Sequence, residues 1–548
     1  MQSVKKTLIF KPVEREHERR RFLLQGKILS VFLSVSLPLL FHTSLNLLFS
    51  FFDTFTAANM NMNVVTTVSV VADIRNALQT ISGGLSVGAG IMISRSFGRG
   101  DDEEVQREIS SVFFIAVFII LFIFTFVLPL SLPILRFCAF PDELLDSGAF
   151  FLSLSLLTLL FTFINTIFFA TEKARGRTKI VMVGNGIVLA AKTILNMMII
   201  TLVSSGKLKS DVAMYLLPLA SGISFGIVTV FALRQLFSKK NPYHVKWEKS
   251  IFNKNLLIQL SQLSFPVFLE KFLIPFGKVI CNALYVGFGS VGVAAYSCSQ
   301  RILALASTPL NAFKDAESNI VSANLGNRNV KRSVSFVIQT FCVTLITSIF
   351  LFTFLWIFSE PLINFFAKGN EQMRESMLLI YRIERWAVFF DAIDGAACGF
   401  LYARKKTKLP TFVNIAKLFG IRIPFFLVLT RVYGFGIEAI AWSILVSNGA
   451  DALLSLLFLW YELTDLKKVS AIEDSCNEKL SLAITALGQW DAFDSGQTRG
   501  HGITVPEEIL KEMCSYYGGT FTIKEMSQLY KEAIIEARIL ALEKEENA

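Results

Sequence analysis

Twelve apolar runs, each long enough to cross a bilayer, constrain the fold of this chain more than any other feature. They begin near Ile28, Val64, Val112, Phe150, Ile180, Val212, Leu256, Val291, Val334, Met377, Thr411 and Gly436. A helix needs roughly 20 residues to cross a hydrocarbon core of about 30 Å, and it satisfies its own backbone polar groups there. Hydrophobic residues make up 53% of the chain, 52 residues are Phe, and the mean hydropathy is +0.54, which together with these runs excludes a soluble protein. The sequence predicts an all-α integral membrane protein with twelve transmembrane helices.

Basic residues concentrate in the N-terminal segment and in alternate loops. The N-terminal segment contains "EREHERRR", and the basic loops are 173–179, 238–249, 327–332 and 403–408. Because translocation disfavours Lys and Arg on the far side of the membrane, both termini are expected to be cytoplasmic, in a plasma (inner) membrane. The same loops explain most of the formal net charge of +10, so nucleic-acid binding is not expected.

An internal repeat divides the predicted membrane part into halves. Pro38 matches Pro266 and Gly98 matches Gly326 at an offset of 228 residues, and "ARGRTK" from Ala174 matches "ARKKTK" at an offset of 229. Each half then has six spans, and an even number makes both halves enter the membrane in the same direction. Two such bundles, related by an axis along the membrane normal, are typical of secondary transporters.

The predicted spans and the repeat divide the chain into five parts. They are a cytoplasmic N-terminal segment (1–27), an N-lobe (28–237), a cytoplasmic linker (238–254), a C-lobe (255–465) and a soluble helical tail (466–548). The tail contains two predicted helices, at 504–519 and 522–542, the second opened by a capping box of Thr522 and Glu525. It is either a module that binds an unknown partner or a packing extension.

Cofactor chemistry has no support in the sequence. The seven Cys include no CxxC pair, the four His have no metal-ligand spacing, and no Gly-rich phosphate loop follows a strand pattern. We therefore predict no enzyme activity, no catalytic residue, no metal and no ATP. Energy is expected from an ion gradient.

Four segments together resemble the multidrug and toxic compound extrusion (MATE) family. They are "LPLLFHTSLNLLFSFFDTF" (37–55), "GGLSVGAGIMISRSFGRGDDEE" (83–104), "GVAAYSCSQRILALASTPL" (292–310) and "VFFDAIDGAACGFLYARKKTKLP" (388–410). The resemblance covers roughly residues 28–465. It implies two six-helix lobes in a protein, expected to be a monomer, that exports organic cations, drugs or toxic metabolites against an inward gradient of Na⁺ or H⁺.

Asp53 is the first intramembrane acid, and it follows the apolar run "LLFSFF". A carboxylate in the membrane core costs on the order of 2.5 kcal/mol or more, so it should face a wet cavity, find a partner, or bind a proton or cation. The resemblance matches it to the family's N-lobe coupling Asp; the alternative is a residue at the outer lip of the span. In the fifth span Asn196 matches the family pattern, but Ile200 replaces the expected second acid. Lys192, one turn earlier, is either a tethered cation or a side chain that reaches the interface.

The C-lobe contains three further acids that are candidates for coupling. Glu270 follows Pro266 by one turn, and Asp391 and Asp394 lie on adjacent turns of one helix face. Asp391 and Glu270 resemble the family's tenth-span Asp and seventh-span Glu, and carboxylates on facing helices can share a proton or hold one cation. The alternative is a set of internal salt bridges, for which Lys271, Lys278 and Arg385 are the candidate partners.

Two other functions remain open at this stage. Further intramembrane charges of both signs occur at Asp73, Arg75, Lys314, Asp315, Glu317, Lys417 and Arg422. They keep a flippase for a lipid-linked or anionic amphiphile, of the same superfamily, as an alternative to cation export. A different class is a membrane scaffold that acts through its tail. Deleting residues 467–548 separates the classes, because a transporter retains flux and a scaffold loses its function.

Overall fold

The structure is a computed structural model that describes residues 12–58, 62–137, 140, 142–208, 210–247, 253–367 and 370–494. These residues form helices and connecting turns, without a strand. The chain divides into two units, Met1–Thr464 and Asp465–Ala548. The two helices predicted within 504–542 lie outside the described residues.

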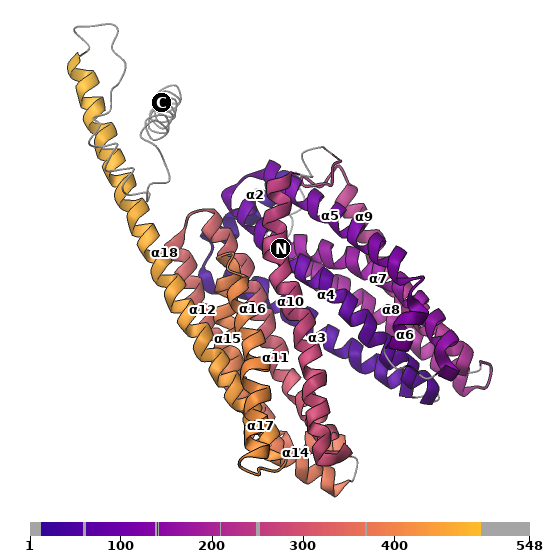
Figure 1. The fold of residues 1–548 in the computed structure, drawn as a ribbon. Coiled ribbons are helices and arrows are strands. Elements are labelled where there is room, and N and C mark those ends of the chain that lie inside the picture. Colours follow the sequence, from indigo (N-terminus) through magenta and orange to yellow (C-terminus); the bar gives the residue numbers. More distant parts are fainter. Residues whose placement is uncertain are drawn as a thin grey trace, which may run out of the picture. The chain divides into compact units, whose positions relative to one another are not determined.

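The helices follow one another along the chain in two similar series (Figure 1). The first is α2 (Pro12–Gln25), α3 (Ile28–Ala58), α4 (Met62–Arg99), α5 (Asp102–Val127), α6 (Ser131–Phe137), η2 (Asp142–Leu144), α7 (Leu145–Ala174), α8 (Thr178–Ser204) and α9 (Ser210–Phe237). The second is α10 (Lys254–Tyr285), η4 (Val286–Phe288), α11 (Gly289–Gly326), α12 (Val330–Ile357), α13 (Ser359–Ala367), α14 (Glu371–Glu384), α15 (Ala387–Ala403), α16 (Lys408–Ile415), η5 (Ala416–Arg422), α17 (Ile423–Arg431) and α18 (Glu438–Asp494).

Nine stretches of the described residues are long and apolar enough to cross a membrane, or ten if the bent pair α14 and α15 forms one span. Helices α10 and α11, with 32 and 38 residues, are also long enough by their rise of 1.5 Å per residue. They are less apolar, because they contain the intramembrane charges of the seventh and eighth predicted spans. The all-α membrane fold is confirmed, and the number of twelve spans stays a prediction.

The repeat is visible in how α4 packs against α11. A Cβ atom on Gly98 would lie 1.9 Å from the carbonyl oxygen of Ala323, and one on Gly326 would lie 2.1 Å from that of Arg95. The two glycines are 228 residues apart, and so are the two residues that they touch. The contact is therefore reciprocal, as it is across a two-fold axis.

Helix capping repeats in the same register. The side chain of Asp101 accepts a hydrogen bond from the backbone N–H of Glu104 at 3.0 Å and begins α5. The side chain of Asn329 accepts one from the backbone N–H of Arg332 at 3.1 Å and begins α12. Asp and Asn are among the best N-cap residues because their oxygens satisfy otherwise unpaired N–H groups. The third long helix of each lobe thus begins with the same kind of N-cap hydrogen bond.

The lobes contact each other along α3, α4, α10 and α11. The hydroxyl of Ser94 on α4 donates to the side-chain oxygen of Asn319 on α11 at 3.1 Å. Lys173, in the last turn of α7, pairs with Asp315 of α11 at 3.6 Å. These polar contacts join the lobes near the ends of α4 and α11.

Helix α2 bridges the same ends of the two lobes. Arg20 pairs with Asp102 at the start of α5, and Arg332 of α12 donates to the backbone oxygens of Leu23 and Gly26. The end of the first unit where these contacts lie is called the α2 end below. A short N-terminal helix therefore connects the N-lobe to the C-lobe.

Candidate functional site

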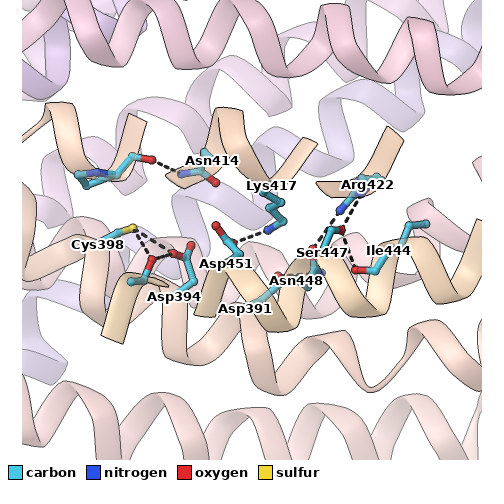
Figure 2. A network of polar contacts seen from close by, with 12 residues as sticks. Asp391, Asp394, Cys398, Asn414, Lys417, Arg422, Ile444, Ser447, Asn448 and Asp451 are labelled. Carbon is cyan, nitrogen blue, oxygen red and sulfur yellow. Dashed lines mark hydrogen bonds and ion pairs between the residues drawn. The ribbon is translucent and has the colours of Figure 1, made fainter. Parts of the chain in front are cut away.

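A π-helical segment, η5, interrupts the helix that runs from Lys408 to Arg431. π-Helical turns inside α-helices are rare and frequently mark functional sites. The segment contains two basic residues, Lys417 and Arg422. Figure 2 shows both side chains directed toward α15 and α18.

Lys417 forms a buried ion pair with Asp451 of α18. Its Nζ atom lies 2.6 Å from Oδ2 of Asp451, whose side chain is 1% exposed. Two charges taken out of water attract each other strongly, and removal of one leaves the other uncompensated. The pair therefore joins η5 to α18 by an interaction that is costly to break.

Arg422 has neutral hydrogen-bond partners. Its Nε donates to the hydroxyl of Ser447, and its Nη2 donates to Oδ1 of Asn448, both at 3.0 Å. Asn448 in turn donates from Nδ2 to Oδ1 of Asp391 at 3.3 Å. Asn448 thus links the guanidinium on η5 to the carboxylate on α15.

Asp394, one turn after Asp391, has different partners. Its Oδ1 accepts hydrogen bonds from the hydroxyl of Ser455 at 2.6 Å and from the thiol of Cys398 at 3.1 Å. Ser455 belongs to α18, as Asn448 does. The two predicted acids therefore both face α18, as the sequence spacing indicates, but each has its own donors.

A cavity of about 270 Å³ lies beside this network. The charged side chains that line it are Lys278, Glu384, Asp391, Lys417 and Arg422. Glu384 accepts a hydrogen bond from Ser299 at 2.6 Å and another from Gln300. At roughly 30 Å³ for each water molecule, the cavity has room for several waters or for a small ligand.

Glu270 lies on α10 and has three donors on the facing helices. These are the hydroxyl of Tyr402 at 3.0 Å, the hydroxyl of Thr411 at 3.4 Å and the amide of Asn414 at 3.3 Å. Asn414 also lines the cavity that Asp391 lines. The structure thus places Glu270 and Asp391 around one polar interior, without a direct contact between them.

The salt bridges predicted as the alternative role of these acids are not found among the described residues. Among the described residues, neither Lys271, Lys278 nor Arg385 pairs with Glu270, Asp391 or Asp394. The guanidinium of Arg385 instead lies 5.6 Å from the ring centroid of Phe352. The three acids instead accept hydrogen bonds from uncharged side chains.

In the N-lobe, α8 buries both predicted residues. Lys192 is 4% exposed and Asn196 is 3% exposed. Such burial disagrees with a lysine that reaches the membrane surface. The side chain of Asp53, on α3, lies outside the described part of the structure, so the N-lobe coupling site stays a prediction. The N-lobe also contains a buried polar contact that the sequence did not indicate, in which Nδ2 of Asn185 on α8 lies 2.6 Å from Nδ1 of His42 on α3.

Asp451, Glu384 and Asn448 are among the residues of the C-lobe site that were not predicted from the sequence. Asp451 is a single acid inside an apolar run, which is the signal that could have identified it. Glu384 stands next to Arg385 and resembles one half of a surface ion pair. Asn448 is uncharged and offers no comparable signal.

A family model matches both halves of the chain. The MatE model matches residues 38–200 and again residues 266–428. Each boundary of the second match lies 228 residues after the corresponding boundary of the first. The chain belongs to the MatE family. Members of this MATE family are transporters, so the resemblance seen in the sequence is confirmed.

Named relatives of this MatE protein are multidrug transporters. It is 22% identical over 419 residues to "Probable multidrug resistance protein NorM" from Thermotoga maritima, which covers 76% of this chain and 88% of the relative. It is 20% identical over 440 residues to "Multidrug export protein MepA" from Staphylococcus aureus, with 80% and 94% covered.

Solved structures share the fold. "Crystal structure of MATE in the bent conformation" superposes with a TM-score of 0.75 at 16% identity, covering 82% of this MatE chain and 99% of that chain. A MOP superfamily transporter from Pyrococcus furiosus, described by "reverse polarity of binding pocket", superposes with a TM-score of 0.75 at 16% identity, with 81% and 98% covered.

Proposed function

We propose that this protein is a secondary active transporter that exports organic cations, drugs or toxic metabolites in exchange for protons, by alternating access. The supporting observation is the buried C-lobe network. It holds three carboxylates and two cations in three neighbouring sets of contacts on η5, α15 and α18: Lys417 with Asp451, Arg422 through Asn448 with Asp391, and Asp394 with Ser455 and Cys398. Over these five charged side chains alone the formal charge is −1, which one proton or monovalent cation would neutralise.

A proton fits this network better than a sodium ion. Oδ1 of Asp391 and Oδ1 of Asp394 already accept hydrogen bonds from Asn448, Ser455 and Cys398. A bound Na⁺ needs several oxygen ligands at once, so it would compete with these donors for the carboxylate oxygens. A proton needs one carboxylate oxygen and leaves the remaining contacts in place.

Protonation would change how three helical segments interact. Asn448 donates to Asp391 and accepts from Arg422, so a neutral Asp391 weakens the contact of α15 with α18 and changes the surroundings of η5. A ligand biases a conformational equilibrium by binding one state better than the other. Loading and release of the proton would then favour opposite orientations of the transporter.

Replacing Asp391 by Asn tests the coupling role. In liposomes that contain the purified full chain, we expect an imposed pH gradient to drive efflux of a fluorescent organic cation by the wild type, and Asp391→Asn to lose it. Asp146→Asn, at an exposed position of α7, is the matched control and should keep the wild-type rate. Wild-type rates for Asp391→Asn under both pH and sodium gradients would disprove the coupling role. Efflux driven by a sodium gradient alone would disprove the proton.

A second candidate is the movement of an anionic amphiphile between leaflets. It is favoured by a lysine between the lobes: a Cβ on Gly83 of α4 would lie 3.1 Å from Cδ of Lys271 on α10. In vesicles that contain a fluorescent anionic lipid, this alternative expects Lys271→Met to slow the movement of that lipid between leaflets. Cation efflux without any lipid movement would reject the alternative.

The remaining assignments are part of the same proposal. We place the α2 end and both termini in the cytoplasm, in the plasma (inner) membrane, because the basic loops 173–179 and 403–408 lie there. The protein acts as a monomer with no cofactor beyond the coupling ion. The lobe boundaries given by the repeat, 28–237 and 255–465, define the two moving parts.

A further inference from the structure

A second, larger cavity lies away from the polar network. It has a volume of about 830 Å³ and is bounded by α10, the connection from α15 to α16, and α18. Its apolar wall consists of Leu263, Leu409, Leu457, Phe458, Trp460 and Tyr461. We call this cavity the α10–α18 groove.

Basic side chains form the polar rim of this groove. Lys405, Lys406 and Lys408 line it, and Glu462 is its one acid among the described residues. Glu462 is already occupied, because it pairs with Arg404 at 3.0 Å and with Lys406 at 3.3 Å. Neither Lys405 nor Lys408 has an ion-pair partner within the described part of the chain. The rim therefore has an excess of positive charge.

The surroundings of Lys405 disfavour its positive charge, although Glu108 acts in the opposite direction. Burial and the nearby Arg95 lower the pKa of the Lys405 ammonium. An anion placed beside Lys405 would relieve this repulsion. The groove also lies at the N-terminal end of α16, where the helix dipole favours negative charge.

An apolar wall beside a basic rim is the combination expected at a membrane surface. Trp460 and Tyr461 are 70% and 64% exposed, and these two residue types gather where hydrocarbon meets headgroups. Basic pockets between transmembrane helices on the cytoplasmic side bind the headgroups of anionic lipids. A free phosphate would use the lysines but would leave the apolar wall uncovered.

We propose that the α10–α18 groove binds one anionic phospholipid from the leaflet at the α2 end, with Lys405 and Lys408 at its phosphate and the Leu457 and Trp460 side of the groove against its acyl chains. The site is separate from the C-lobe network, and it does not depend on what the protein transports.

Lipid binding to the purified full chain in neutral detergent tests this proposal. The probe is phosphatidylglycerol with a fluorescent acyl chain, compared with phosphatidylcholine that has the same label. We expect tighter binding of phosphatidylglycerol, and roughly 25-fold weaker binding after Lys405→Ala together with Lys408→Ala, which corresponds to about 1 kcal/mol for each lysine. Lys239→Ala together with Lys240→Ala, in an exposed basic segment, is the matched control and should bind as the wild type does.

Two further measurements keep the test decisive. The thermal midpoint of each variant in detergent shows that it is folded, and Trp460→Ala should weaken phosphatidylglycerol binding without any change in charge. Equal affinity for the two lipids, or an unchanged affinity in the double lysine variant, would overturn the proposal. Equal competition by soluble glycerol phosphate at the same concentration would show a phosphate site in place of a lipid site.

Discussion

Lys417 and Asp451 show how strongly one pair of residues can hold the C-lobe together. Their atoms are 2.6 Å apart and Asp451 is 1% exposed. Lys417→Met removes the positive charge and leaves a buried carboxylate without its counter-ion. We expect the variant to lose about 3–5 kcal/mol of folding free energy, seen as a lower thermal midpoint of the purified protein in detergent.

This prediction has two controls, a double variant that removes both charges of the pair and a variant of an exposed ion pair. Lys417→Met combined with Asp451→Asn removes both charges of this pair and should recover most of the loss. Arg374→Met removes an exposed ion pair, since Glu371 is 66% exposed, and should cost at most about 1 kcal/mol. A Lys417→Met protein as stable as the wild type would show that the ion pair contributes nothing to stability.

The residues of this site were only partly predictable from the sequence. An acid inside an apolar helix can be recognised in the sequence, because an unpaired charge is costly in a membrane. Glu270, Asp391 and Asp394 were predicted as site residues in this way. Their hydrogen-bond donors could not be predicted, because Asn448 lies 57 residues after Asp391 and Ser455 lies 61 residues after Asp394. Which donors reach these acids depends on how α15 packs against α18, and the local sequence pattern does not indicate this packing.

At the scale of elements, the contact of α4 with α11 depends on two glycines. A methyl group on Gly98 or Gly326 would meet a backbone carbonyl of the other lobe at about 2 Å, and a carbonyl cannot rotate away as a side chain can. We expect Gly98→Ala and Gly326→Ala each to cost about 1–3 kcal/mol or more. The measurement is the thermal midpoint in detergent.

Gly186→Ala on α8 is the matched control. No atom lies within 4 Å of a Cβ there, and alanine is the better helix former by about 1 kcal/mol. This variant should be as stable as the wild type or slightly more stable. Equal behaviour of Gly98→Ala and Gly186→Ala would contradict the close packing of α4 on α11.

Elements were easier to predict than their irregularities. The apolar runs and the 228-residue repeat indicated the long helices and their paired arrangement, because lipid permits few alternatives. The π-helical η5 and the 46° bend between α14 and α15 were not predicted. Such breaks occur where side chains contact neighbouring helices, as Lys417 of η5 contacts Asp451 of α18. They leave the hydrophobic pattern of the sequence unchanged.

At the scale of the whole molecule, the contacts at the α2 end bear on the transport cycle. Ser94 with Asn319 and Lys173 with Asp315 join the lobes directly, and α2 joins them through Arg20 and Arg332. In alternating access the lobes rock about a central site, so one end closes as the other opens. If the α2 end opens during the cycle, the contacts between the lobes there must break.

A reversible cross-link between the lobes tests this consequence. Ser94 and Asn319 are in hydrogen-bond contact, with 3.1 Å between their side-chain oxygens, so cysteines at both positions lie within reach of a short bifunctional methanethiosulfonate. We expect Ser94→Cys with Asn319→Cys to lose efflux in liposomes after cross-linking and to regain it on reduction. Each single variant, treated alike, controls for reaction at the native cysteines and should keep its flux. Undiminished efflux by the fully cross-linked double variant would mean that the lobes do not separate at the α2 end, and the alternating-access part of the proposed function would then be wrong.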